Sequence, residues 1–216
     1  MNIGFAHNVH QRLQVLKETI LIEKELFPDC HTSVAYNDLF INIFNEINNI
    51  EFVKFNDNTH KIGCTNGSVL SVKPLLDKPV DIIIFSHDDV KINKDYLSVL
   101  MNHIDNILNK NYDIVCRNPK NFYGSNYYMM EALIMSKEAA IKIFEKQETI
   151  TKEEDLPRDF FTSLSPEVWL YNIINNKNLN IKVIPYENRN EDYDYNKNLG
   201  EAMGYYHINA GKRGWV

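Results

Sequence analysis

Cysteine is scarce in this chain of 216 residues, and the placement of the few that occur excludes two common uses. The three cysteines, Cys30, Cys64 and Cys116, are odd in number and lie far apart, without the short spacings of a zinc site or a disulfide framework. This usage is typical of proteins in a reducing compartment. We therefore expect a cytoplasmic protein without structural disulfides.

Long hydrophobic runs are also lacking. The N-terminus begins Met1-Asn2-Ile3-Gly4 and has neither the basic stretch nor the apolar run of a secretory signal peptide. No apolar segment approaches the roughly 20 residues that cross a bilayer. The sequence thus predicts a protein without an integral membrane segment.

Positive charge is not in excess. The formal net charge is -6 at pH 7 and the pI is about 5.6. Non-specific binding to a nucleic-acid backbone requires basic surface, so the overall charge does not favour a nucleic-acid partner. The net charge does not exclude a local basic patch.

The remaining composition is that of a folded domain. Hydrophobic residues make up 44% and aromatic residues 12% of the chain, which argues against disorder. Short β-type runs alternate with amphipathic segments, and there is no internal repeat and no long linker. This alternation predicts an α/β fold built in layers, and the length suits a single domain.

The positions of the elements follow from this alternation. Strands are expected at residues 2–6, 33–36, 51–55, 80–85, 112–116, 131–135 and 181–184. Helices are expected after the first strand and from Asp38, Asn93, Ser136 and Ser165, the last of these reinforced by Pro166. A loop is expected at residues 60–68, and a polar, aromatic tail at residues 187–216 is expected to pack as a loop over the rest.

The clearest buried strand is Val80–Phe85, whose nearly continuous apolar run suits a parallel sheet covered on both faces. It is followed by Ser86-His87-Asp88-Asp89, at the carboxyl end where open α/β sheets bind ligands. Two adjacent carboxylates repel each other, and a cation would relieve that cost. Carboxylates beside a diphosphate suit Mg²⁺ or Mn²⁺. The alternative is an acidic turn that caps the next helix.

The stretch Asp81–Val90 resembles the DxD-type motif of GT-A glycosyltransferases, in the variant where His replaces the first Asp. The order of the flanking elements is also similar to that of the glycosyltransferase family 2-like group, within the nucleotide-diphospho-sugar transferases, over roughly residues 1–210. The resemblance implies one GT-A (Rossmann-like) domain, with a mostly parallel central sheet flanked by helices. It also implies a division into a nucleotide-sugar-binding half (1–118), an acceptor-side half (119–186) and a C-terminal closing tail (187–216).

The same resemblance assigns roles within the motif. Asp89 matches the last Asp and would ligate the metal, while Asp88 would face the ribose or the water shell of the metal. His87 stands where the family usually has Asp, and a histidine there suits a hydrogen bond to a ribose hydroxyl.

Further nucleotide contacts are implied near the starts of the expected loops. Ala6-His7-Asn8 stands where many family members carry a Pro-Thr-Tyr-Asn-like turn. Tyr36 ends the second expected strand, and Asn66 lies in the expected loop before the motif strand. For that loop, a simple Asn-Gly turn is the alternative.

His207 is the second candidate metal ligand, because GT-A enzymes often complete the metal sphere with a distant histidine and imidazole serves Mn²⁺. Lys212 and Arg213 follow it and would neutralise a departing nucleoside diphosphate. The alternative is a surface histidine followed by a basic tail.

Glu167 is the candidate general base, since it resembles the acidic residue of the acceptor-side motif of the family. The alternative is a favourable interaction with the dipole of its own helix. Asp155 and Asp159 compete for the same role. The aromatic, amide-rich segment at residues 121–128 suits sugar contacts or, alternatively, closure of the core.

These observations predict a metal-dependent glycosyltransferase, a hexosyltransferase, which uses a nucleotide-sugar donor and a saccharide or other hydroxyl acceptor, with Mn²⁺ or Mg²⁺ as cofactor. A modified DNA base is an alternative acceptor, and a non-catalytic nucleotide-sugar-binding domain is an alternative class. A nucleotidyltransferase is disfavoured, because Asn8–Arg12 lacks the Gly-rich signature usual after the first strand.

Overall fold

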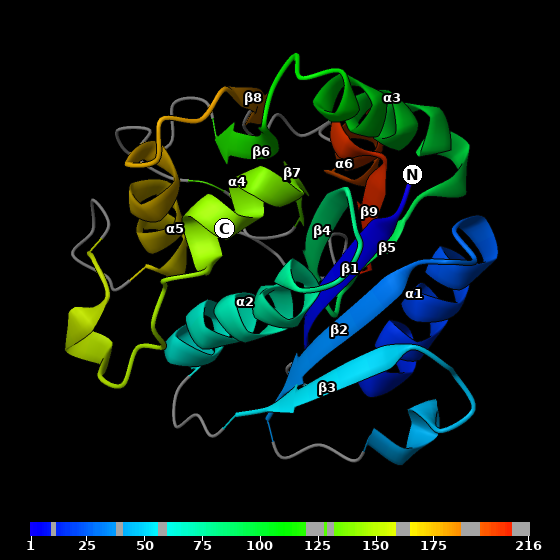
Figure 1. The fold of residues 1–216 in the computed structure, drawn as a ribbon, viewed down its shortest axis with the longest axis horizontal. Helices are drawn as coiled ribbons and strands as arrows, with labels where there is room; N and C mark the ends of the chain where they lie inside the picture. The colour runs from blue at the N-terminus through cyan, green and yellow to red at the C-terminus, as the bar shows by residue number, and fades with distance from the viewer. Residues whose placement is uncertain are drawn as a thin grey trace.

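A seven-stranded sheet in the order β3-β2-β1-β4-β7-β6-β8 forms the centre of the computed structural model (Figure 1). Neighbouring strands are parallel except β7, which runs antiparallel to both β4 and β6. The strands are β1 (Ile3–Val9), β2 (His31–Tyr36), β3 (Ile50–Lys54), β4 (Ile82–His87), β6 (Ile114–Pro119), β7 (Ala132–Ser136) and β8 (Ile181–Tyr186). The mixed α/β fold with a mostly parallel sheet is thus confirmed. The structure describes residues 1–9, 12–37, 41–55, 60–119, 128, 132–158, 165–186 and 195–208.

Helices cover both faces of the sheet (Figure 1). They are α1 (Leu13–Leu26), α2 (His60–Leu76), α3 (Leu97–Leu108), α4 (Lys137–Phe144), α5 (Pro166–Asn175) and α6 (Tyr195–Met203), with short 3-10 helices at Ile41–Phe44, Lys94–Tyr96 and Glu153–Asp155. A second, two-stranded sheet pairs β5 (Val90–Ile92) with β9 (Tyr205–His207). Helices α2, α4 and α5 pack on one face of the large sheet, and α1, α3 and α6 pack on the other.

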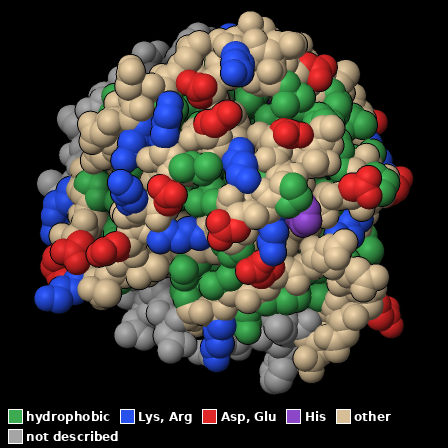
Figure 2. All heavy atoms as spheres, viewed as in Figure 1, with side chains coloured by type: hydrophobic (Ala, Val, Ile, Leu, Met, Phe, Trp, Pro, Cys, Tyr) green, Lys and Arg blue, Asp and Glu red, His purple; other side chains and the backbone are tan. Residues whose placement is uncertain are grey.

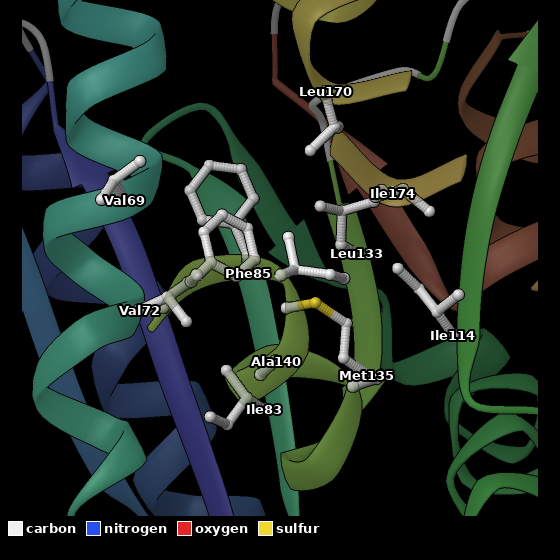
Figure 3. Packing of buried hydrophobic residues seen from close by; sticks show 14 of the residues in the cluster. Val69, Val72, Ile83, Phe85, Ile114, Leu133, Met135, Ala140, Leu170 and Ile174 are labelled. Atoms are coloured by element: carbon white, nitrogen blue, oxygen red, sulfur yellow. The ribbon is translucent and has the colours of Figure 1, made fainter. Parts of the chain in front are cut away.

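Strand β4 is buried on both faces because its apolar run alternates between two cores. Ile83 and Phe85 pack in the core with α2, α4 and α5, and Figure 3 shows Phe85 near Val72 of α2 and Ile83 near Ala140 of α4. Ile82 and Ile84 pack against the opposite core with α3 and α6. Burying four such side chains contributes on the order of 1.5–3 kcal/mol each, so β4 is a firm support for the residues that follow its end.

Three of the predicted helix starts have the capping contacts that their sequences suggested. Asn93 Oδ1 accepts from the Asp95 N–H, Ser136 Oγ accepts from the Ala139 N–H, and Ser165 Oγ accepts from the Val168 N–H. Each contact satisfies a donor that the first helical turn leaves open.

Three predictions about local structure are wrong. Of the helix predicted from Asp38, the described residues 41–47 contain a 3-10 helix at Ile41–Phe44 and then a turn, and Asn49 lies in the left-handed region at φ 61°. Residues 60–68 are part of helix α2 rather than a loop. The tail is not a loop throughout, since its described part, residues 195–208, contains α6 and β9.

Two sequence observations, the lack of excess positive charge and the lack of long hydrophobic runs, can be compared with the structure. On the face drawn in Figure 2, Lys and Arg side chains are interspersed with Asp and Glu rather than gathered by sign. Within the described ranges, no helix is long and apolar enough to cross a membrane.

Candidate functional site

The order of the strands creates a topological switch point between β1 and β4. From β1 the chain moves outward to β2 and β3, and it then returns to the other side of β1 to form β4. The connections that leave the carboxyl ends of β1 and β4 therefore diverge, which opens a place for a ligand between them. His87, the last residue of β4, lies opposite Asn8 in register, and Asp88-Asp89 follow at this point.

Asp88 and Asp89 are both largely buried, and Arg12 binds both of them. The Arg12 backbone N–H donates to Asp88 Oδ2 at 3.0 Å, and Arg12 Nη1 donates to Asp89 Oδ2 at 2.7 Å. The Asp89 side chain is 12% exposed and the Arg12 side chain 32% exposed. Adjacent buried carboxylates need a nearby cation, and the guanidinium meets that need in this structure. Sequence reasoning did not single out Arg12, although it is the one Lys or Arg in the Asn8–Arg12 segment.

The described part of the tail is hydrogen-bonded to Asp89, the second residue after β4. The Ile208 N–H donates to the Asp89 carbonyl at 2.9 Å, and β9 pairs with β5 so that His207 lies opposite Val90. The backbone of His207 is thus adjacent to the predicted metal ligand Asp89, although the two are far apart in the sequence. The His207 side chain lies outside the described part, so its role as a ligand stays a prediction.

Gly204 makes this attachment sterically feasible. Its φ is 77°, in the region that favours glycine, and an added Cβ would lie 2.9 Å from the backbone nitrogen of Leu100. Its carbonyl accepts from the Asn93 N–H at 2.9 Å. The turn between α6 and β9 is therefore held close to the start of α3.

A buried polar network lies on the α1 face, at the switch point. His7 Nε2 contacts Glu23 Oε2 at 2.9 Å, and His7 Nδ1 contacts Ser86 Oγ at 3.0 Å. Burial raises the pKa of the Glu23 carboxyl, while the neighbouring His7 opposes that rise. Burial also raises the pKa of the Tyr205 phenol, and the charge of Glu23 adds to the effect. The hydrogen bonds of the network thus link α1, β1 and β4, and Tyr205 of β9 lies near Glu23, with no hydrogen-bond partner for its hydroxyl among the described residues.

The three residues predicted to form a nucleotide-binding turn are part of strand β1 and are buried. Ala6 lies between β2 and β4, and His7 is committed to Glu23 and Ser86. Asn8 points to the other face, where its amide donates to the Gly63 carbonyl at 3.1 Å. Their described contacts are structural, and a direct nucleotide contact stays a prediction.

Two further predicted nucleotide contacts are also engaged within the protein. Tyr36 ends β2 and packs edge-on against Phe52. Asn66 lies inside helix α2, where its amide accepts from the Ile150 N–H at 2.7 Å and donates to the Ile150 carbonyl at 2.8 Å. This paired contact gives Asn66 a role in fixing the chain near residue 150.

His87 is partly exposed at the end of β4. Its ring packs edge-on against Phe85, with the ring centroids 5.5 Å apart. Its position beside Asp88 keeps it among the residues that a ligand at the switch point would meet.

Glu167 lies at the start of α5, where its carboxylate accepts from Ser165 Oγ at 3.0 Å. Because β8 follows α5 and runs parallel to β6, the start of α5 lies at the same edge of the sheet as the end of β4. Asp155 is exposed in a 3-10 helix. Asp159, the segment at residues 121–127, Lys212 and Arg213 lie outside the described residues.

The donor set fits a cation that is only partly coordinated by protein. No group of three or more His, Cys, Asp or Glu side chains able to hold a metal occurs in the described part of the chain. Two carboxylates at a diphosphate site are nonetheless the usual protein share for Mg²⁺, whose other ligands come from phosphate and water. Asp88 and Asp89 fit such a shared site and do not fit a structural metal enclosed by side chains.

Comparison with known proteins gives distant likenesses only. No protein-family model matches the chain, and no curated protein sequence matches it. A197 from STIV has a TM-score of 0.43 and 13% identity, over 85% of this chain and 81% of that one. A protein assigned as a nucleotide-diphospho-sugar transferase from Desulfovibrio desulfuricans G20 has a TM-score of 0.47 and 9% identity, over 94% and 90%. The nucleoside-diphosphate-sugar pyrophosphorylase from Vibrio cholerae RC9 has a TM-score of 0.47 and 11% identity, over 86% and 92%. These likenesses are too distant to support a function, which has to be inferred from the residues of this chain.

Proposed function

We propose that this chain is a metal-dependent glycosyltransferase, which moves a sugar from a nucleoside-diphosphate sugar, UDP-linked, to an acceptor hydroxyl. The observation that supports this most directly is the position of Asp88 and Asp89. Both carboxylates lie at the topological switch point, directly after the buried strand β4, with the backbone of His207 alongside. An α/β sheet binds phosphate-containing ligands at such a point.

Asp89 and His207 are the proposed ligands of Mn²⁺ or Mg²⁺. Asp88 would face the ribose or the water shell of the cation, and the partly exposed His87 would hydrogen-bond a ribose hydroxyl. Bound there, the cation would neutralise charge on the departing nucleoside diphosphate.

The remaining roles belong to the acceptor side and the tail. In this proposal Lys212 and Arg213 add positive charge when the end of the chain closes over the donor, and closure excludes water. The tail predicted at residues 187–216 does not act as one closing segment, because α6 and β9 are part of the packed core. Glu167 activates the acceptor hydroxyl if the reaction inverts the anomeric centre, and it orients the acceptor if the configuration is retained. The division of the chain at residues 118 and 186 into donor and acceptor parts is part of the same proposal.

A non-catalytic nucleotide-sugar-binding domain is the second candidate, and one observation favours it. Arg12 already neutralises Asp89 at 2.7 Å, which is the state expected if no divalent cation ever binds there. In that case UDP would bind without any metal requirement and no sugar would be transferred.

A donor screen tests the proposal. The protein is incubated with a panel of nucleotide sugars and Mn²⁺, and the released nucleoside diphosphate is measured for wild type and for Asp89→Asn. We expect release from one donor class in the wild type and a loss of about 100-fold or more in the variant, because oriented charge stabilisation of this kind is worth several kcal/mol.

Asp95→Asn is the matched control, since it removes the same charge from an exposed side chain six positions along the chain. It should keep wild-type turnover. Full activity in Asp89→Asn would rule out the assigned role of that carboxylate, and an inert wild type across the whole panel would favour the binding domain.

A further inference from the structure

Arg12 is anchored at the predicted donor site by its backbone and reaches the metal-ligand candidate with its side chain. Its N–H donates to Asp88 Oδ2 at 3.0 Å, and its Nη1 donates to Asp89 Oδ2 at 2.7 Å. The backbone contact fixes where the side chain starts, directly before helix α1. With about a third of its side chain exposed, the guanidinium also borders solvent. Arg12 can therefore change partners without moving the strand end.

The charges at the site favour such a change. Asp88, Asp89 and Arg12 together carry one net negative charge, counting each ionised group as one. A divalent cation on Asp89 would turn this into one net positive charge and would repel the guanidinium beside it. The two negative charges of a sugar-linked diphosphate would restore one net negative charge. The guanidinium then has a better partner in the phosphate than in a carboxylate already shared with a metal.

We propose that Arg12 is a diphosphate-binding residue whose guanidinium leaves Asp89 and binds the donor. This inference rests on the proposed function. Without a nucleotide, Arg12 occupies Asp89 and competes with the metal. With a nucleotide, the metal takes Asp89 and Arg12 binds a phosphate oxygen. A guanidinium suits this role because its planar fork of donors matches carboxylate and phosphate geometry equally well.

If the exchange occurs, Arg12 weakens the binding of Mn²⁺ alone and strengthens the binding of UDP with Mn²⁺. A purely structural role for Arg12 would not produce these opposite effects. Isothermal titration of the full chain with MnCl₂ alone, and with UDP in saturating Mn²⁺, measures both affinities. In Arg12→Gln we expect Mn²⁺ alone to bind about threefold to tenfold tighter, because the competing cation is gone. We expect UDP to bind about tenfold or more weakly, because a charge-assisted contact is lost.

Two further variants separate charge from geometry. Arg12→Lys keeps the positive charge but not the fork, so Mn²⁺ alone should bind as in wild type while UDP binds more weakly. Lys94→Gln removes one positive charge that is paired with Glu25 rather than with the aspartates, and it should change neither affinity by more than about twofold.

The titrations distinguish failure of the exchange from failure of the proposed function. A parallel loss of both affinities in Arg12→Gln, or no change in either, would overturn the exchange while leaving the proposed function standing. A wild-type chain that binds neither Mn²⁺ nor UDP would overturn the proposed function and the exchange together. Opposite shifts in the two affinities, with Lys94→Gln unchanged, would establish the exchange.

Discussion

At the end of β1, the side chain of Asn8 sets how closely helix α2 approaches the sheet. Its amide donates to the Gly63 carbonyl at 3.1 Å and to the Cys64 carbonyl at 3.4 Å. Gly67, one turn further along α2, has no Cβ, and an added one would overlap the Asn8 amide. The helix can lie this close to the strand only because both residues have these identities.

Gly67→Ala should therefore destabilise the fold by about 1–3 kcal/mol, the usual cost of overpacking, despite the higher helix propensity of alanine. Urea unfolding measures this. Asn8→Ala removes the obstacle, so the double variant should be less destabilised than the sum of the two single variants. Strict additivity would mean that the Asn8 side chain does not limit the space at residue 67.

Individual residues of the site differ in how readily the sequence reveals them. Asp88 and Asp89 were predicted, because an acidic pair directly after a buried apolar run stands at the edge where α/β sheets bind ligands. Glu23 was not singled out, although it continues the spacing of Leu16 and Ile20 on the buried face of α1. A charged residue on an apolar stripe signals a buried partner, but only the fold shows that His7 of β1 supplies it, with Ser86 of β4 at the other ring nitrogen of His7.

Between elements, His103 joins helix α3 to α6, the helix that leads into β9. Its Nε2 lies 2.7 Å from the Ala202 carbonyl, which can only accept, so Nε2 carries the proton and Nδ1 accepts from the Tyr112 hydroxyl at 3.0 Å. Burial lowers the pKa of His103 below its ordinary value of 6.5, while the Ala202 carbonyl opposes that change.

The consequence is a loss of stability in acid. Because the folded chain binds a proton at His103 less readily than the unfolded chain, the stability from this group is fully present above pH 6.5 and falls as the pH drops below it. His103→Gln keeps a donor for Ala202 and removes the titration. Its unfolding free energy should therefore depend less steeply on pH between about pH 7.5 and about pH 5 than that of wild type.

His31→Gln is the matched control, since it makes the same change at a partly exposed histidine in β2. An unaltered pH slope in His103→Gln, measured by denaturant unfolding, would show that the α3–α6 contact does not carry this acid sensitivity.

Helices and strands were predictable where the periodicity of the sequence was strong. They were missed where contacts with distant parts of the chain determined the local structure. The apolar run of β4 and the capped starts of α4 and α5 are local signals, and the structure contains all three. Residues 60–68 are helical because packing against β1 outweighs their glycines, and β9 forms because β5 supplies a partner strand far away in the sequence. Neither cause can be read from a short window.

At the scale of the whole molecule, alternating strands and helices predicted a layered α/β fold, but they did not give the order of the strands. That order places the ends of β1 and β4 at the switch point and brings residues 8 and 88 together, and the pairing of β5 with β9 adds residue 207. The sheet therefore creates the site, whereas the sequence alone indicated only the separate residues that contribute to it.

The proposed function requires that this switch point bind a metal together with a nucleoside diphosphate. Isothermal titration of the wild-type chain with UDP, in the presence of Mn²⁺ and then with the metal chelated, tests it most directly. We expect UDP to bind with Mn²⁺ and to bind at least about tenfold more weakly without it, a difference of about 1.4 kcal/mol or more. Equal binding under both conditions, or no binding under either, would contradict the claim.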